Sequence, residues 1–266
     1  KAIDEPRTGE GDVELVSALG NLALVEGDPA TRDRLLVREH DTLAQLLGKD
    51  HVLTLQSAFK GAVFAARPDV AASRLRDACR RLEQLHAEAA ALITECSYEL
   101  GWLAEERGDT AETRAAMQRV GDERRPVAQA YLAAAGGNLD EAIRQARAAA
   151  AGLPGEWWTR FYASDGLLFA AICADRLHRT AEAIASLRAA LAIYDQLTMI
   201  AQQTYFQRRV ARARALLARL VAPSDPAEAA RLAGAAAAWY RAAGGSDAIA
   251  AQMEELEKLA AGARGR

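Results

Sequence analysis

The feature that most constrains the fold is a helix, break, helix pattern at residues 94–120, TECSYELGWLAEERGDTAETRAAMQRV. Its first part places Ser97, Leu100, Gly101 and Ala104 at helical spacing, so small and apolar side chains share one narrow face. A face of this kind lets a second helix approach closely. The pattern therefore predicts packed helices rather than a sheet.

The break between the two parts carries residues suited to end one helix and begin another. Gly108 favours the positive φ that commonly follows a last helical turn, and the Asp109 side chain can cap the next helix. Glu112, three residues later, suits a capping box. The second part then places three inward residues at helical spacing: Thr113, Met117 and Val120. We predict an antiparallel helical hairpin.

Related patterns recur along most of the chain. The predicted first helices lie at residues 12–26, 51–66, 87–107, 123–136, 157–177 and 202–221. The breaks between them and their partner helices include Gly27-Asp28-Pro29, Arg67-Pro68-Asp69, Gly108-Asp109, Gly137-Asn138 and Pro223-Ser224-Asp225-Pro226, of which Gly137-Asn138 is the clearest. Aligning these breaks gives about six hairpins whose starts are roughly 30 to 46 residues apart, which is the signature of a helical repeat array.

The composition agrees with closely packed helices. Hydrophobic residues make up 51% of the chain but aromatic residues only 6%, and alanine, the best helix former, supplies much of the apolar fraction. We predict an all-α, right-handed solenoid of hairpins with a C-terminal capping helix. Residues 1–11 are interpreted as a linker, 12–262 as the repeat domain and 263–266 as a tail. The polar start suggests a piece of a longer protein.

Charge and hydropathy disfavour two classes of partner. The formal net charge is −3, so the chain lacks the overall basic character that neutralises nucleic-acid phosphates. Its longest apolar run, about residues 166–174, is far shorter than the roughly 20 residues that a membrane-spanning helix needs. We therefore expect neither nucleic-acid nor membrane binding.

The sequence shows no pattern of catalytic or metal-binding residues. The three cysteines, Cys79, Cys96 and Cys173, are far apart and are interpreted as small buried residues in a reducing, cytoplasmic compartment. CxxC, HxxxH and HExxH spacings do not occur, so we expect no metal and no cofactor. The histidines do not form a recognisable triad motif, and the chain is expected to be non-catalytic.

The repeats resemble the tetratricopeptide (TPR) family. Its first-helix pattern of a Leu-Gly pair followed by Ala is matched by Leu19-Gly20-Ala23 and Leu100-Gly101-Ala104. Its second-helix pattern is matched by Ala142-Ala146-Ala149-Pro154 and Ala183-Leu187-Ala190. The resemblance covers nearly the whole chain, although no single unit shows every position and the spacings exceed the family norm. It implies a scaffold that binds a protein or peptide.

Two segments resemble particular groups of proteins that contain such repeats. LGKDHVLTL, residues 47–55, is similar to an element of longer repeats in kinesin light chains and bacterial signalling proteins, with Val52 in place of the usual Pro. The segment from residue 211 to 244 resembles the C-terminal ends of bacterial, myxobacterial-type serine/threonine kinases. The glycine-rich loop, HRD and DFG motifs of the kinase itself are missing here. The resemblance implies a docking or sensory region of such a kinase.

In this family the ligand groove is lined by first-helix positions that alternate with core positions. Carried over by register, the groove residues are Asn21, Gln56, Lys60, Tyr98, Trp102, Glu105 and Tyr131. The same register also places Asp165 on the inner surface of the predicted solenoid, which is the surface that the first helices line. A second interpretation remains open, in which Tyr98 and Trp102 fill an interface between neighbouring hairpins.

One basic segment and the function each admit more than one interpretation. The run QRRVARAR, residues 207–214, is interpreted as a solvated surface face in preference to a phosphate site. Besides a protein-binding scaffold, the repeats are compatible with a small-molecule-sensing domain like those of large ATP-dependent bacterial transcription regulators. Self-association through the alanine-rich residues 233–238 is a third hypothesis, and the sequence does not indicate an oligomeric state.

Overall fold

The computed structural model describes residues 10–26, 28–65, 68–122, 124–152, 157–197, 204–243, 254–259 and 261. These residues form helices and turns, with no β-strand among them, which confirms the all-α prediction. The elements are α1 (Glu10–Val25), α2 (Pro29–Leu47), α3 (Val52–Val63), α4 (Pro68–Glu83), the short 3-10 helix η1 (His86–Ala89), α5 (Ala90–Glu106), α6 (Thr110–Met117), α7 (Arg125–Ala135), α8 (Leu139–Gly152), α9 (Trp157–Arg176), α10 (Thr180–Gln196), α11 (Thr204–Val221) and α12 (Pro226–Ala243).

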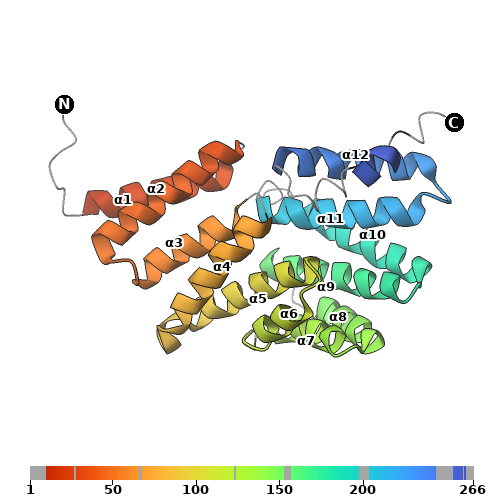
Figure 1. The fold of residues 1–266 in the computed structure, drawn as a ribbon, viewed down its shortest axis with the longest axis horizontal. Coiled ribbons are helices and arrows are strands. Elements are labelled where there is room, and N and C mark those ends of the chain that lie inside the picture. Colours follow the sequence, from red (N-terminus) through yellow and green to blue (C-terminus); the bar gives the residue numbers. More distant parts are fainter. Residues whose placement is uncertain are drawn as a thin grey trace.

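Each helix packs against the next one in the sequence (Figure 1). The array curves as it proceeds, so that α11, late in the chain, comes to lie near α5 and the end of α3. Residues 254–259 are also helical. Most of the predicted linker, residues 1–9, and the predicted tail, residues 263–266, lie outside the described residues.

The helix starts follow the predicted capping residues. Asp28, Asp109, Asn138 and Asp225 each accept a hydrogen bond from the backbone N–H three residues later, at 2.8–3.1 Å. Proline follows Asp28 and Asp225 at the first helical position, where its missing N–H is harmless. The predicted capping box at Asp109 forms only in part, because the Glu112 carboxylate pairs with Arg76 and Arg107 instead.

Three helix ends share one turn geometry. The residues Gly108, Gly137 and His178 follow α5, α7 and α9 with φ of 74°, 86° and 57°. At each turn the next residue donates its backbone N–H to a carbonyl five residues earlier, as between Arg179 and Ala174 at 2.9 Å. This is the Schellman hydrogen bond, which satisfies a carbonyl at the helix end. The chain therefore reverses in the same way at three points along the array.

Small residues set the close approach of neighbouring helices. A Cβ at Gly101 would lie 2.7 Å from the Met117 side chain, and one at Gly166 would lie 2.9 Å from the Ala146 carbonyl oxygen. Real Cβ atoms do not approach other heavy atoms so closely. Glycine at these positions therefore allows α5 to pack on α6 and α9 on α8 at short range.

Two of the cysteines form a disulfide, so the prediction of three free cysteines is wrong. Cys79 in α4 and Cys96 in α5 are bonded, with their Cα atoms 5.6 Å apart. Helical periodicity places both inward but carries no distance between helices, which is why the sequence did not reveal the pair. Since disulfides are rare in the reducing cytosol, the pair weighs against the expected cytoplasmic location.

The third cysteine, Cys173, is free and buried. Burial raises the pKa of its thiol to about 12, so the reactive thiolate is scarce at neutral pH. As for membrane insertion, the described helices include none that is both long and apolar enough to cross a bilayer.

The disulfide predicts a definite thiol count. Unreduced protein, unfolded in guanidinium chloride and treated with Ellman's reagent, should release one equivalent of chromophore, from Cys173 alone. Reduction before the assay should raise the count to three, the number of cysteines in the chain. Three equivalents without reduction would show that Cys79 and Cys96 are not bonded.

Candidate functional site

The basic segment of α11 meets the acidic side chains of α5 and α9. Arg209 Nη2 lies 2.9 Å from both carboxylate oxygens of Glu99, and Arg209 Nε lies 2.9 Å from the Asp165 carboxylate. Arg209 is 1% exposed and Asp165 is fully buried. Three helices that are distant in sequence are therefore joined by one guanidinium group.

Two tyrosines also donate hydrogen bonds to the Asp165 carboxylate. Tyr194 donates its hydroxyl to Asp165 Oδ1 at 2.7 Å, and Tyr98 donates to Oδ2 at 3.1 Å. Burial raises the pKa of the Asp165 carboxyl, while Arg209 and the Tyr194 hydrogen bond oppose this rise. Burial, reinforced by the nearby Asp165, raises the pKa of both tyrosines well above the usual value. Their hydroxyls thus stay protonated as donors.

The same arginine also stacks on an aromatic ring. Although burial alone would lower the pKa of Arg209, Asp165 and Glu99 raise it well above its ordinary value, so the group stays charged. Its guanidinium carbon lies 4.3 Å from the centre of the Trp102 ring, within the range of a cation–π interaction. Arg212 contacts the same ring at 5.4 Å.

A second carboxylate is held farther along α5. Glu105 lies 2.7 Å from Arg176 of α9 and 2.8 Å from Arg212 of α11. We call Glu99, Glu105, Asp165, Arg176, Arg209 and Arg212 the arginine–carboxylate cluster. It pairs three acidic groups with three basic ones, so the charges of the cluster balance, with Arg176 at its exposed edge.

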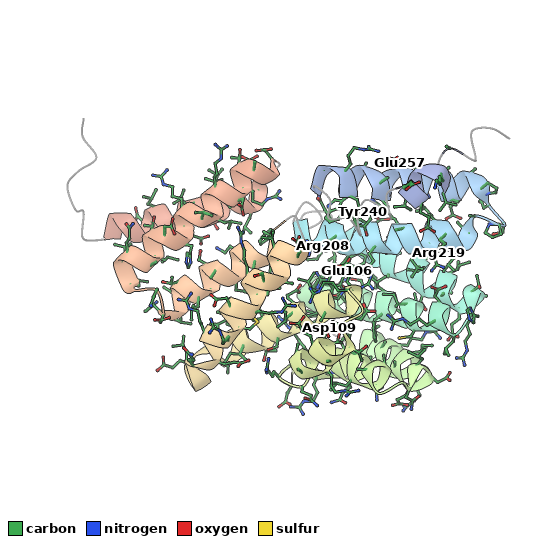
Figure 2. All side chains as sticks on the ribbon, in the orientation of Figure 1. Glu106, Asp109, Arg208, Arg219, Tyr240 and Glu257 are labelled. Carbon is green, nitrogen blue, oxygen red and sulfur yellow. A yellow bond between two sulfur atoms is a disulfide. The ribbon has the colours of Figure 1, made fainter. Side chains whose placement is uncertain are left out.

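A further arginine of α11 reaches the amino-terminal half of the array. Arg208 donates to the Ala65 carbonyl, just after α3, at 3.0 Å. Burial lowers the pKa of Arg208, while Glu106 opposes this, and Figure 2 shows both residues in the middle of the molecule. The last part of the array is thus tied to the region after α3.

These contacts correct the interpretation of residues 207–214. Arg208 and Arg209 are 3% and 1% exposed, so the interpretation of this run as a solvated face is wrong for them. Their partners come from helices far away in sequence, which periodicity within α11 does not report. The sequence offers one signal for these partners, the acidic residues Glu99, Glu105 and Asp165 on predicted first helices. The family register assigns only Glu105 and Asp165 to the inner surface.

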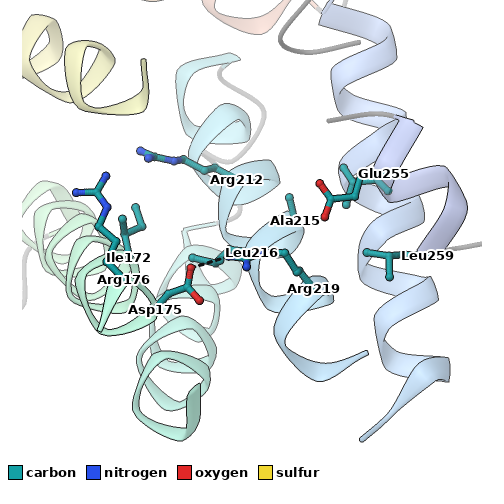
Figure 3. A pocket seen from close by; sticks show the side chains of 10 residues that line it. Ile172, Asp175, Arg176, Arg212, Ala215, Leu216, Arg219, Glu255 and Leu259 are labelled. Carbon is teal, nitrogen blue, oxygen red and sulfur yellow. Dashed lines mark hydrogen bonds and ion pairs between the residues drawn. The ribbon is translucent and has the colours of Figure 1, made fainter. Parts of the chain in front are cut away.

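A cavity of about 240 Å³ opens beside the cluster, between α9, α11 and residues 254–259 (Figure 3). Arg176 and Arg212 extend to the same side in Figure 3, and both pair with Glu105. Arg219 pairs with Asp175 at 2.6 Å. The basic groups along this cavity are therefore already compensated within the chain.

Four of the predicted groove residues are buried. Tyr98, Trp102 and Tyr131 are at most 1% exposed, and Glu105 is 6% exposed. Tyr131 stacks on Phe169 with ring centres 3.7 Å apart, and Tyr98 and Trp102 lie at the contact of α5, α9 and α11. In this arrangement the four residues offer no surface to a partner.

The other three predicted groove residues are accessible to different degrees. Asn21 and Gln56 are exposed, whereas Lys60 is half-buried and pairs with the buried Glu39 at 2.7 Å. A Cβ at Gly20 would lie 2.6 Å from Glu39 Oε1 and 2.9 Å from Lys60 Nζ. Gly20 therefore leaves room for an ion pair that joins α2 to α3 beneath α1.

The amino-terminal helices also carry the exposed large apolar side chains. Within the described part of the chain these lie between residues 15 and 53: Leu15, Leu22, Val25, Val37, Leu46, Leu47 and Leu53. On α1, Leu15, Leu22 and Val25 are 42–72% exposed, and the exposed Ala18 falls on the same helical face. We call Leu15, Ala18, Leu22 and Val25 the α1 apolar stripe.

The described residues contain no group of three or more His, Cys, Asp or Glu placed to hold a metal ion. No family model matches the chain, and no curated protein matches it at a significant level of similarity. The geometry of the site is therefore the basis for the functional assignment.

The buried pairing at Arg209 predicts a large loss of stability when the arginine is removed. Arg209→Met would leave Asp165 and Glu99 without this counter-charge, which costs about 3–5 kcal/mol for a buried pair. The matched control is Arg241→Met, since Arg241 is 61% exposed and pairs with Glu257 at the surface. Such exposed pairs contribute about 0–1 kcal/mol.

Urea unfolding followed by circular dichroism measures both free energies. The Arg209 variant should lose at least about 2 kcal/mol more than the Arg241 variant. Equal losses would mean that α11 is not held by its buried arginine.

Proposed function

We propose that the chain is a non-catalytic scaffold that binds a protein or peptide, built as a right-handed solenoid of TPR-like hairpins. The sequential packing of the helices and the repeated turns at Gly108, Gly137 and His178 support this architecture. So does the resemblance of the Leu-Gly-Ala and Ala-Ala-Ala positions to that family. An array of this kind presents long helical surfaces to partners.

The single observation that carries the binding proposal is the α1 apolar stripe. Leu15, Leu22 and Val25 are exposed by 42%, 51% and 72%, whereas the described residues after Leu53 include no large apolar side chain that is exposed. Clustered exposed apolar residues on a globular protein commonly mark an interaction surface. A partner that covered the stripe would remove these side chains from water, which supplies the driving force for binding.

The spacing of the stripe indicates the form of the partner segment. Residues 15, 18, 22 and 25 follow the three-four spacing of a coiled-coil seam. An amphipathic helix can lay its own apolar face along such a seam. We therefore propose an amphipathic helix of another protein as the bound segment, with Asn21 available for hydrogen bonding at the edge.

The inner surface is a weaker candidate in its carboxyl-terminal half. The arginine–carboxylate cluster closes it around Tyr98, Trp102, Glu105 and Tyr131, and opening it would expose buried charges. Near α3 the surface is more accessible, and Gln56 lies on the same helical face as the exposed Leu53. Lys60 is committed to Glu39, so we assign it a structural contact.

The proposal extends to the parent protein. LGKDHVLTL and the segment after residue 211 resemble repeat regions of bacterial serine/threonine kinases, and we propose that this scaffold is the docking region of such a kinase. The LGKDHVLTL segment forms the junction of α2 and α3. His51 caps α3 there by accepting a hydrogen bond from the Leu53 N–H at 3.2 Å.

A library of displayed amphipathic helices provides a direct test of binding at the stripe. We expect selected peptides to bind the wild-type chain with micromolar affinity by fluorescence anisotropy. Leu22→Asp combined with Val25→Asp should weaken binding by at least about tenfold, because the apolar contact is lost and two charges would be buried. The matched control is Ala189→Asp, on the exposed face of α10.

The control variant should bind the selected peptides as the wild type does, and circular dichroism should show equal helicity for all three proteins. Peptides that bind the double variant undiminished would place the interaction away from α1. Failure of the library to yield any binder above background would contradict the proposed amphipathic-helix partner.

A further inference from the structure

We propose that a cavity between α2 and α4, with α3 as its floor, binds a small uncharged aromatic molecule that carries an O–H or N–H donor. The cavity measures about 370 Å³, which lies within the usual range of ligand pockets. It is lined by side chains from all three helices. The proposal is independent of the partner surface on α1, because it rests on different residues.

The floor holds a serine whose hydroxyl is unpaired among the described residues. Ser57 is 2% exposed and lines the cavity, yet its Oγ has no hydrogen-bond partner in the part of the chain that the structure describes. A serine inside a helix usually bonds the carbonyl one turn earlier, and a buried unpaired hydroxyl is unfavourable. This oxygen has almost no accessible surface, so a ligand's polar group would satisfy it after the Ser57 side chain turned toward the cavity.

A glycine on the same floor keeps the cavity open. Gly61 lies within α3, and a Cβ placed on it would meet nothing within 4 Å. Close packing explains why glycine stands at positions 20 and 101, because added Cβ atoms there would meet neighbours at under 3 Å. Close packing does not explain Gly61. Since glycine weakens a helix relative to alanine, its presence here keeps free volume in the cavity at a cost in helix stability.

His40 adds an acceptor to one wall. Its Nδ1 lies 3.2 Å from the Thr54 carbonyl oxygen, which can only accept, so Nδ1 carries the hydrogen. In the neutral imidazole Nε2 is then an acceptor, and His40 lines the cavity. A ligand O–H or N–H is the complement of this nitrogen.

The charged groups of the lining are already paired with one another. Arg74 lies 2.9 Å from Asp33, and Arg81 lies 3.6 Å from Asp77. These pairs leave no net charge among the acidic and basic lining residues, which favours an uncharged ligand over an ion. The remaining walls include three apolar side chains, from Leu36, Val37 and Ala58.

An aromatic ring with one donor meets these requirements together. The ring would bury apolar surface against Leu36 and Ala58, and the donor would reach His40 or Ser57. Phenols and indoles are the simplest members of this class. Indole and N-methylindole form a matched pair of probes, because they differ only in the N–H donor and one methyl group.

Two-dimensional NMR of the isotope-labelled full chain, titrated with each probe, tests the proposal. Indole should shift the backbone signals of Ser57 and Gly61, with a dissociation constant below about 1 mM. This affinity is within reach of a ligand of indole's size. N-methylindole should bind at least about fivefold more weakly, because it leaves the cavity acceptor unpaired. Equal affinity for the two probes would overturn the assigned hydrogen bond, and absence of shifts at α3 would overturn the site.

Two substitutions at one position separate filling of the cavity from damage to the fold. Gly61→Leu should weaken indole binding by at least about tenfold, because its side chain occupies the cavity. Gly61→Ala should raise the thermal midpoint and keep indole affinity within about twofold, since its Cβ meets open space. Undiminished binding to a folded Gly61→Leu variant would mean that indole occupies another site.

Discussion

The ion pair between Arg209 and Asp165 is the contact on which the carboxyl-terminal half of the structure depends. A buried charge is costly unless it is paired and hydrogen-bonded, and here each partner finds its complement only when α5, α9 and α11 converge. The paired charges favour the position in which Arg209 also meets Glu99 and the Trp102 ring.

The position of α11 against α5 and α9 limits where a partner can bind. A scaffold of stacked helices ordinarily offers its inner surface to partners, but in this chain the cluster occupies that surface around α5 and α9. The accessible apolar groups lie instead on the first helices, and a cavity of about 370 Å³ lies between α2 and α4. These observations favour the proposed partner site on the amino-terminal helices, whereas the buried ion pairs hold α5, α9 and α11 together.

Local features of the fold were predictable from the sequence, because their physical causes are local. Gly108 and Asp109 mark a helix end and the next helix start through backbone conformation and capping, both of which depend on adjacent residues. The long-range features were not predictable in this way. Cys79 and Cys96 are bonded across two helices, and Arg209 finds partners more than forty residues away, as with Asp165. Periodicity identifies inward faces but not which of them meet.

The predicted groove residues show the same difference between local and long-range causes. Asn21 and Gln56 were expected to be accessible, and they are exposed because none of the later described helices covers them. Trp102 was expected on an open surface by family register, but α11 covers it with two arginines. Register determines the direction of the side chain relative to its own helix, whereas accessibility depends on an element a hundred residues later.

Hydroxyl-radical footprinting read by mass spectrometry tests this closure most directly, because it reports the solvent access of individual aromatic side chains. Trp102, Tyr98 and Tyr131 should resist oxidation, while the half-buried Trp239 should react at least about fivefold faster in the same sample, as its greater exposure requires. Oxidation of Trp102 at a rate equal to that of Trp239 would contradict the buried arrangement, because it would mean that the inner surface is open.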